Sequence, residues 1–537
     1  MRESLGLACL LLAACAGALA AEPPAIPDRA TAETFKDAPA PWRDYLVQAR
    51  AAERIADPLQ RCLAFPDIPG NKWPPGHAAA HCRYHFAYKT PSLAEIAAML
   101  DGGKVAEFEA LVDASQQRHF SEQDFSEDIH EIFNRGVFDA SPESDRITAK
   151  WLQLAPRSAY ANLARGSFLS SSAWEARGGK YASETPGASL RRMSELVGEA
   201  ITYYEKAISL NPRLMPAYTA LANIAMADSR EDVEKSAFER GQQIDPACVE
   251  RARVRMVSLE PRWGGSYEAM LGYANELKQY LPRRPQLAIH VEAPFVDRGS
   301  VLVDADEYDK STLGVLETAI AIGSDESALR NAAKVASYPS DGQPDRDKTL
   351  AYLLQEARFR EPSAWASREL AWWLVRPEPQ WGLRYALKAT ALDPDNALGH
   401  YLAGAGFYNV NRYVDADREY AIAIQDPAQR RASLREVAEM WLFSGFQKNA
   451  NQKPGTARAK PYIDRLLREY PDDGRGWIMR WYYAAMMSDS GASVKEIPAV
   501  LAKVDRDDPW QVERVEFLEK LESRNVPGPI YMSARGK

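Results

Sequence analysis

A hydrophobic pattern of helical period, interrupted by prolines at nearly equal intervals, constrains the fold of this chain more than any other feature. The pattern is clearest over 199–227. In its first part, Ala200, Tyr204, Ala207 and Leu210 recur at spacings of three and four, which places them on one face of an amphipathic helix. That helix must end before Pro212, because a proline inside a helix removes a hydrogen bond and clashes with the preceding turn. Pro246 follows Pro212 by 34 residues, and two more helices fit between them. This copy is carried by Ala200, Tyr204, Ala207, Pro212, Tyr218, Leu221, Ala222, Phe238 and Pro246.

A second copy of the pattern covers 382–427. There Pro427 follows Pro394 by 33 residues, and a weaker third copy ends at Pro471. Alanine and glycine let the two helices of a hairpin approach closely, while tyrosine and phenylalanine fill the space between neighbouring hairpins. We therefore expect stacked helical hairpins in both regions. The second copy is carried by Ala386, Ala389, Pro394, Gly404, Phe407, Ala416, Tyr420, Ala423 and Pro427.

The period and the order of small, aromatic, small and terminal proline residues resemble the tetratricopeptide repeat (TPR). This resemblance implies an all-α solenoid of helical hairpins that binds proteins or peptides on its concave face. The match is irregular in places, since Glu234 stands where a small residue is expected. Over roughly 150–290, "SAWEARGG" and "PRWGGSYEAML" also resemble a family of exported bacterial proteins whose domain has no assigned function. That second resemblance implies fold and secretion only.

The repeat pattern divides the chain into blocks. A Ser-x-x-Glu capping box at Ser92 marks the start of the first block. The stretch "LAIHVEAPFVDRGSVLVD" alternates in the manner of a short β-hairpin or a long connection, so we expect a break there. The predicted parts are a signal peptide (1–20), a Pro-rich Cys/His segment (21–91), a first helical block (92–282), an irregular connection (283–345), a second helical block (346–524) and a flexible tail (525–537).

The charge balance argues against nucleic acid as a partner. The chain of 537 residues has 66 Lys+Arg against 74 Asp+Glu, a formal net charge of -8, and no run of basic residues. Nucleic-acid binding draws on clustered basic side chains that displace counterions from phosphates. Beyond the leader, no stretch of 18 uncharged apolar residues could span a membrane. We therefore expect protein or peptide partners, no nucleic acid, and no transmembrane span in the mature chain.

The first twenty residues, "MRESLGLACLLLAACAGALA", have the pattern of an export signal. A short segment with Arg2 precedes an apolar run, which ends in small residues suited to cleavage after Ala20. The segment also contains a lipobox-like Leu-Ala-Ala-Cys, in which Cys15 would be acylated and become the mature N-terminus. We expect the soluble periplasmic form, because small apolar residues continue past Cys15 to the cleavage site. The alternative is a lipoprotein anchored through Cys15.

Three cysteines lie beyond the leader: Cys62, Cys82 and Cys248. In an oxidising compartment Cys62 and Cys82 are natural partners across a loop containing proline and glycine, so we predict a disulfide between them. Cys248 is left over and is expected to be a buried small apolar side chain, since nothing near it in the sequence suggests an activated thiolate.

Three histidines at a spacing of four, His77, His81 and His85, form the one candidate for metal chemistry that the sequence offers. On a helix they share one stripe, but His77 and His85 lie about 12 Å apart along the axis and cannot share an ion. At most one neighbouring pair could chelate, with further ligands from elsewhere. We expect a partly exposed helix beside the disulfide, with no metal, no cofactor and no catalytic residue. The alternative is a metal-dependent hydrolase or metal-trafficking protein that uses this stripe.

Four tryptophans crowd into "WASRELAWWLVRPEPQW" and raise a third possibility, carbohydrate binding. Trp372 and Trp373 differ by about 100° around a helix, so both cannot point fully inward. The exposed one is a candidate for a contact surface. The reading that these patterns favour most is an exported TPR-like scaffold or adaptor of the cell envelope.

Overall fold

The structure is a computed structural model that describes residues 23–28, 34–122, 125–133, 136–180, 182–443, 453–524, 526 and 528–532. Within these residues the regular secondary structure is helical, apart from one isolated antiparallel bridge between Ala492 and Ile530. The predicted all-α fold is confirmed. The predicted signal peptide, including Cys15, lies outside the described residues, as does most of the predicted tail.

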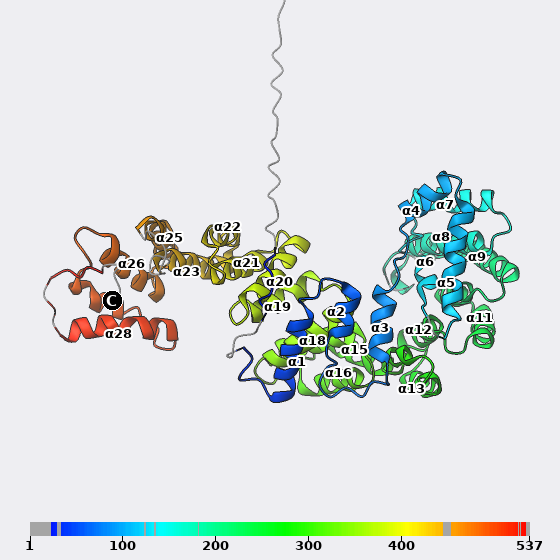
Figure 1. The fold of residues 1–537 in the computed structure, drawn as a ribbon, viewed down its shortest axis with the longest axis horizontal. Helices are drawn as coiled ribbons and strands as arrows, with labels where there is room; N and C mark the ends of the chain where they lie inside the picture. Colours follow the sequence, from blue (N-terminus) through cyan, green and yellow to red (C-terminus); the bar gives the residue numbers. More distant parts are fainter. Residues whose placement is uncertain are drawn as a thin grey trace, which may run out of the picture. The chain divides into compact units, whose positions relative to one another are not determined.

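The chain forms two compact units that divide after Pro362. The N-terminal unit is Ala30–Pro362, and Ser363–Lys537 belongs to the C-terminal unit. The helices of the N-terminal unit (Figure 1) are α1 (Ala40–Ala52), α2 (Pro58–Ala64), α3 (His77–Phe86), α4 (Leu93–Asp101), α5 (Val105–His119), α6 (Asp128–Ile132), α7 (Pro142–Leu154), α8 (Ala159–Arg177), α9 (Gly187–Leu210), α10 (Met215–Ala227), α11 (Glu231–Ile244), α12 (Val249–Ser258), α13 (Tyr267–Leu277), α14 (Ala288–Val291), α15 (Ala293–Asp304), α16 (Lys310–Ile322), α17 (Glu326–Ser337) and α18 (Arg346–Phe359).

In the C-terminal unit too, helices that are neighbours in the sequence pack against each other as hairpins. They are α19 (Ala364–Leu374), α20 (Pro379–Leu392), α21 (Ala397–Asn409), α22 (Tyr413–Ala423), α23 (Pro427–Phe443), α24 (Lys453–Ala457), α25 (Ala459–Glu469), α26 (Gly474–Met487), α27 (Ile497–Leu501) and α28 (Pro509–Ser523).

Close helix contact in both units depends on a glycine that faces a tyrosine. In the N-terminal unit a Cβ on Gly166 of α8 would overlap the ring of Tyr204 of α9. In the C-terminal unit a Cβ on Gly404 of α21 would lie 2.8 Å from the ring of Tyr420 of α22. The same small-against-aromatic pairing thus recurs in two separate repeats, which is the packing that the sequence pattern implies.

The side chains of the repeat residues lie in the core, and the prolines stand where helices end or begin. Helix α9 ends two residues before Pro212, α11 two before Pro246, and α20 two before Pro394, whereas Pro427 starts α23. The buried repeat residues are Ala200, Tyr204, Ala207, Tyr218, Leu221, Ala222, Phe238, Ala386, Ala389, Gly404, Phe407, Ala416, Tyr420 and Ala423.

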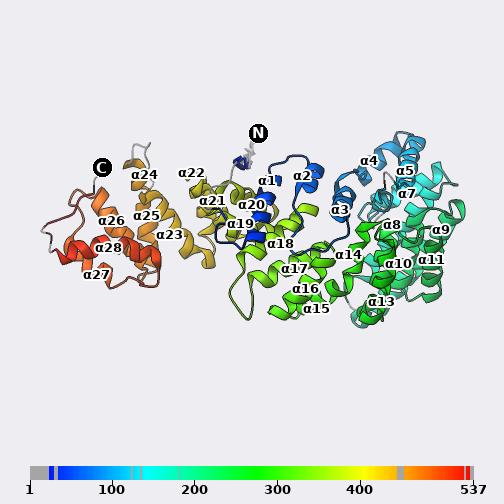
Figure 2. The ribbon, with the colours of Figure 1, turned by 60° about the horizontal axis from the view of Figure 1, so that its bottom comes forward.

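The predicted irregular connection at 283–345 is wrong: most of this segment is helical, in α14 to α17 (Figure 2). The apolar alternation that resembled a β-hairpin belongs to α14 and α15. Helix α15 has Pro294 in its first turn, where a proline is tolerated. Gly299 of α15 lies against Leu316 of α16, so these two helices also pack closely. Short apolar runs do not by themselves distinguish helix from strand. Helix α18 belongs to the N-terminal unit, so the division of the chain also falls later than expected.

The Pro-rich Cys/His segment at 21–91 contains three helices, α1, α2 and α3. Two of these helices start with caps that the sequence supplies. The Asp57 side chain accepts a hydrogen bond from the amide of Gln60 at the start of α2, and Gly76, in the left-handed region at φ 81°, precedes α3.

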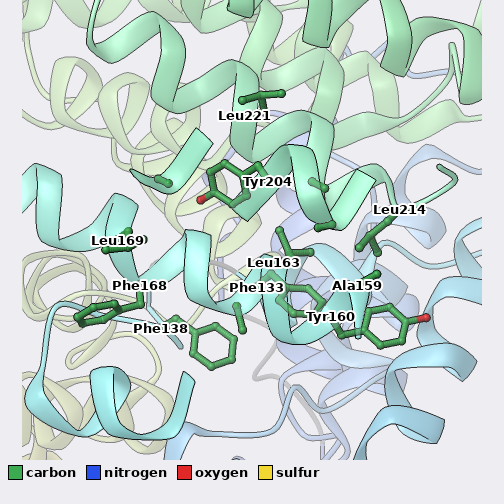
Figure 3. Packing of buried hydrophobic residues seen from close by; sticks show 14 of the residues in the cluster. Phe133, Phe138, Ala159, Tyr160, Leu163, Phe168, Leu169, Tyr204, Leu214 and Leu221 are labelled. Carbon is green, nitrogen blue, oxygen red and sulfur yellow. The ribbon is translucent and has the colours of Figure 1, made fainter. Parts of the chain in front are cut away.

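Aromatic side chains tie the short helix α6 to the first hairpins. The ring of Phe133, which follows α6, lies 6.2 Å from Phe138, 6.4 Å from Trp151 of α7 and 6.3 Å from Tyr160 of α8, measured between ring centroids. Figure 3 shows Phe133, Phe138 and Tyr160 gathered in one cluster. This cluster fixes the position of α6 beside α8 and α10.

Candidate functional site

A groove runs across the first helices of three consecutive hairpins, α8, α10 and α12, with α6 at its side. It encloses a cavity of about 330 Å³. Its walls are formed by Ser167, Ser170 and Trp174 of α8, Pro216, Thr219, Ala220 and Asn223 of α10, Glu250, Arg253 and Val254 of α12, His130 and Phe133 at α6, and Tyr204 of α9. A second cavity of about 830 Å³ adjoins the first, because both are lined by Gly136 and Trp174.

Side-chain caps hold the N-termini of two of the three helices that line this groove, α8 and α12. The Ser158 side chain accepts a hydrogen bond from the amide of Ala161 and caps α8. The carboxylate of Glu127 accepts hydrogen bonds from the amides of Val249 and Glu250, at 2.7 and 2.8 Å, so it occupies the N-terminus of α12. A carboxylate at a helix N-terminus stabilises the helix dipole and satisfies free N–H groups. The segment that carries α6 is therefore fastened to α12.

Several polar and aromatic side chains in the groove are available to bind a ligand. The amide of Asn223 makes no hydrogen bond to the described part of the chain. Arg253 donates two hydrogen bonds to Glu250, at 2.8 and 2.7 Å, yet its side chain is 46% exposed. Trp174 forms an edge contact with Trp263, with ring centroids 6.4 Å apart, and the guanidinium of Arg177 lies over its ring. The groove thus combines aromatic walls with a free amide and an accessible ion pair.

Helix α3 is partly exposed, at Arg83 and His85 for example, but the structure buries two of the three histidines of the stripe. His77 is 1% and His81 2% exposed, whereas the His85 side chain is 29% exposed. Burial lowers the pKa of His77 to about 3. The stripe faces the supposed irregular connection: Ser324 contacts His77 and His81, and Glu326, at the start of α17, contacts His81 and His85. Because sequence spacing gives no sign of contacts between such distant segments, Ser324 and Glu326 were not predicted.

Cys62 of α2 and Cys82 of α3 lie at disulfide-bonding distance, with their Cα atoms 5.7 Å apart. Both side chains are buried with Ala78 and Phe359 in a small core. Arg358 of α18 donates a hydrogen bond to the carbonyl of Cys62 and pairs with Asp67 at 2.7 Å. The two short helices are thus held together and against α18.

A second group of potential ligands, which sequence spacing did not reveal, lies beside the groove. His119, Glu127, His130 and Cys248 are all buried, and one ligand atom from each lies within 4.8 Å of the others. Nε2 of His119 lies 3.2 Å from a carboxylate oxygen of Asp245. Burial raises the pKa of the Cys248 thiol well above its usual value, as expected for a cysteine that behaves as a small apolar side chain.

The tryptophan-rich segment leaves one ring on the surface. Trp372 of α19 is 46% exposed, whereas Trp381 of α20 is fully buried in the core of the C-terminal unit. The two adjacent tryptophans of α19 differ as expected, since Trp373 is half-buried.

Helical hairpins follow one another along the chain, and their first helices start 34 residues apart for α10 and α12 and 33 residues apart for α19 and α21. The chain has a tetratricopeptide-like fold. No family model and no curated protein matches the sequence. Among solved structures, the chain is similar to the TPR domain of P58(IPK), at 12% identity over 62% of this chain and 95% of that chain, with a TM-score of 0.25.

Two further solved structures are similar over more of this chain. The hetero-tetramer Cut9–Hcn1 of the APC/C aligns at 11% identity over 89% of this chain and 94% of that chain, with a TM-score of 0.30. Yeast Tom70 aligns at 11% identity over 78% of this chain and 96% of that chain, with a TM-score of 0.28. At these values the description of the fold rests on the helices and contacts of this chain itself.

Proposed function

We propose that this chain is an exported adaptor of the cell envelope, which binds an extended peptide or protein segment in the groove of α8, α10 and α12. The observation that carries the proposal is the amide of Asn223, which has no hydrogen-bond partner among the described residues and lies in an accessible groove between aromatic walls. No helix in the described part of the chain is long and apolar enough to cross a membrane. Export is supported by the signal pattern of the first twenty residues.

The chemistry of the groove matches that of an extended polypeptide. Every peptide unit other than proline offers one N–H donor and one carbonyl acceptor. An asparagine amide offers both complementary groups, so Asn223 can bind one peptide unit through two hydrogen bonds. A cavity of about 330 Å³ lies at the lower end of the size range of ligand pockets, so it can take one or two side chains of the ligand.

The Glu250–Arg253 pair gives the groove a means to select its ligand. Both side chains are already paired with each other, so neither is an unpaired charge in the free protein. A ligand with a carboxylate next to its apolar anchor can bind the exposed guanidinium of Arg253, which suits bidentate binding of carboxylates. We therefore expect selected ligands to contain an acidic residue close to an aromatic or aliphatic one.

Selection of peptides from a random display library, followed by affinity measurement with the purified chain, tests this proposal. The double variant Asn223→Ala/Arg253→Ala should weaken binding of the selected peptides by tenfold or more, equivalent to about 1.4 kcal/mol. The matched control is Lys235→Ala/Glu239→Ala on α11, which removes an exposed ion pair outside the groove. Equal affinities of both double variants, or no enrichment of any peptide, would contradict the proposal.

A further inference from the structure

We propose that Nε2 of His81, Nε2 of His85 and Oε1 of Glu326 form a binding site for one divalent transition-metal ion, with Zn²⁺ the best match. The three atoms form a compact triangle. Nε2 of His85 lies 3.0 Å from Nε2 of His81 and 3.2 Å from Oε1 of Glu326, and the third side, from His81 to Glu326, measures 3.5 Å. This site is independent of the groove and of the adaptor function.

The size of the triangle fits tetrahedral coordination. Zinc binds histidine nitrogen at about 2.0–2.1 Å and carboxylate oxygen at about 2.0–2.2 Å. In a tetrahedron with such bonds, neighbouring ligand atoms lie roughly 3.3–3.5 Å apart. The observed sides bracket this value without any movement of α3 or α17. A set of two histidines and one glutamate is also a known ligand set for zinc sites with an open fourth position.

A chain of hydrogen bonds fixes which nitrogen of His81 carries its proton. The carbonyl of Pro285 can only accept, so Nδ1 of His77, at 2.9 Å, must donate to it. A buried imidazole with no carboxylate partner is neutral, which leaves Nε2 of His77 as an acceptor. The hydroxyl of Ser324, at 2.7 Å, therefore donates to that atom.

The same hydroxyl completes the assignment. Oγ of Ser324 lies 2.7 Å from Nδ1 of His81, and its own hydrogen is directed at His77, so it accepts a hydrogen bond from the Nδ1–H group of His81. In the neutral ring that carries its proton on Nδ1, Nε2 of His81 presents its lone pair to the triangle. A partner that holds the remote N–H of a histidine, and so sets its tautomer, is the usual support of a metal-binding imidazole.

The ligands are held in place before an ion binds. The ring of Phe359 stacks on His81, with centroids 4.2 Å apart and planes 14° from parallel. Cys82, the residue after His81, is joined to α2. Glu326 is the first residue of α17, which is capped by Asp325, and the amide of Asp325 is itself bound by the buried carboxyl of Glu292 at 2.8 Å. Ligands fixed by such support lose little freedom when the ion binds.

Charge and access both suit a dication. The carboxyl groups of Asp325 and Glu356 interact electrostatically with Glu326, whereas burial raises the pKa of Glu292 well above its usual value, so that carboxyl adds little charge. Arg330 pairs with Glu356 and offsets part of this negative charge. His85 and Glu326 are partly exposed, at 29% and 19%, so the ion can enter from solvent. The fourth coordination position then remains for water or for a donor atom of a partner.

The buried group of His119, Glu127, His130 and Cys248 is the weaker candidate for an ion. Both carboxylate oxygens of Glu127 already accept backbone hydrogen bonds. Sγ of Cys248 accepts one from the amide of Arg251, and all four side chains are buried. An ion there would have to displace helix caps, whereas the triangle of His81, His85 and Glu326 loses only contacts among its own members.

Titration of the chelator-treated full chain with Zn²⁺ and with Co²⁺ tests the proposal. We expect one ion per chain and the visible absorption of tetrahedral Co²⁺. His85→Ala and Glu326→Gln should each weaken binding by 100-fold or more, while the supporting change Ser324→Ala should weaken it about 10- to 100-fold. His85 is partly exposed and Glu326→Gln keeps the side-chain shape, so both variants should fold, which far-UV circular dichroism checks.

Two further variants locate the ion. His400→Gln in the C-terminal unit controls for the loss of any histidine, and Cys248→Ser reports on the buried group beside the groove. The proposal requires that both leave the affinity unchanged. It is overturned if no ion binds at micromolar concentration, if His85→Ala and Glu326→Gln bind as the parent does, or if Cys248→Ser alone abolishes binding.

Discussion

Nε2 of His85 lies 3.2 Å from Oε1 of Glu326, although the two residues belong to helices at opposite ends of the N-terminal unit's sequence. Their meeting follows from the way that α2 and α3 fold back onto α16, α17 and α18. The indole of Trp73 donates to the carbonyl of Ile320 at 2.8 Å, and Arg358 holds the carbonyl of Cys62. A segment that the sequence presents as a separate N-terminal part is thus integrated into the helical array.

Ser324→Ala should destabilise the chain as well as weaken metal binding. The change leaves two buried nitrogens, Nε2 of His77 and Nδ1 of His81, without a hydrogen-bond partner. An unsatisfied buried polar group costs about 1–3 kcal/mol. We expect the free energy of unfolding, measured in urea without metal, to fall by about that amount. Ser311→Ala, which removes an exposed hydroxyl at the start of α16, should change it by less than about 0.5 kcal/mol.

Gly166→Ala should disrupt the contact between α8 and α9. The added methyl group overlaps the ring of Tyr204, which cannot easily move because its hydroxyl is hydrogen-bonded to Ser170 at 2.7 Å. Overpacking of this kind costs about 1–3 kcal/mol. Gly272→Ala in α13 is the matched control, since a Cβ there meets nothing within 4 Å. That control should be neutral or stabilise by up to about 1 kcal/mol, through its higher helix propensity. We therefore expect Gly166→Ala to lower the thermal midpoint and Gly272→Ala to leave it unchanged or raise it; a fall of equal size in both would contradict the prediction.

The disulfide predicted from the sequence should stabilise the fold, because it lowers the conformational entropy of the unfolded chain. The two cysteines are separated by 20 residues, and closure of a loop of this size contributes about 3 kcal/mol in the chain-entropy model. The double variant Cys62→Ala/Cys82→Ala should lower the free energy of unfolding by about 2–4 kcal/mol. Peptide mapping without reductant checks the bond itself. Recovery of both cysteines as free thiols from oxidised, exported protein would show that no bond forms.

The charge state of His400 should depend on its partner Glu419. The hydrogen bond between them, 2.7 Å long, raises the pKa of His400 above its usual value, and the carbonyl of Pro394 binds the other ring nitrogen. A raised folded-state pKa contributes stability that is fully present below about pH 6.5 and is lost as pH rises through the folded-state value. In an NMR titration, His400 should therefore titrate above about pH 6.5. Glu419→Gln should bring its pKa down, while the nearby Asp395 stays in place.

The mature N-terminus distinguishes the two forms of export. Cleavage after Ala20 predicts a mature chain that starts with Ala21, whereas lipoprotein processing predicts an acylated Cys15 at the N-terminus. Intact mass and N-terminal sequencing of the protein from the periplasm and from the membrane fraction separate them. We expect the soluble form that starts at Ala21. Full-length protein with Met1 retained in the cytoplasm would contradict export altogether.

The repeats could be predicted from sequence because their signal is local and periodic. Pairs such as Gly404 and Tyr420 stand at spacings set by one hairpin, so the pattern itself encodes the contact. Helices α14 to α17 were missed for the opposite reason. Their apolar residues lack the proline-bounded period, and a short alternating run is compatible with either strand or helix until its partners are known.

Only the two histidines of the proposed metal site could be predicted from the sequence. The spacing of His81 and His85 is a local helical signal, and it indicates a possible chelating pair. Ser324 lies in a loop, and Glu326 is the first residue of α17. The only signal that the sequence gives there is an ordinary helix cap at Asp325. Nothing in one sequence links that cap to α3. Contacts of this kind are set by tertiary packing, and the groove residue Asn223 was missed for the same reason.

Photo-crosslinking from inside the groove tests the proposed adaptor function most directly. A photoreactive phenylalanine analogue is placed at position 223 in the groove or, as a control, at position 235 on α11. Each variant is the full chain, expressed in the organism that exports it to its cell envelope. We predict discrete crosslinked adducts from position 223 that disappear when a peptide selected by display is added. Any adducts from position 235 should be unaffected by that peptide. Adducts of equal pattern from both positions, or adducts from 223 that the selected peptides leave unchanged, would show that the groove is not the binding site.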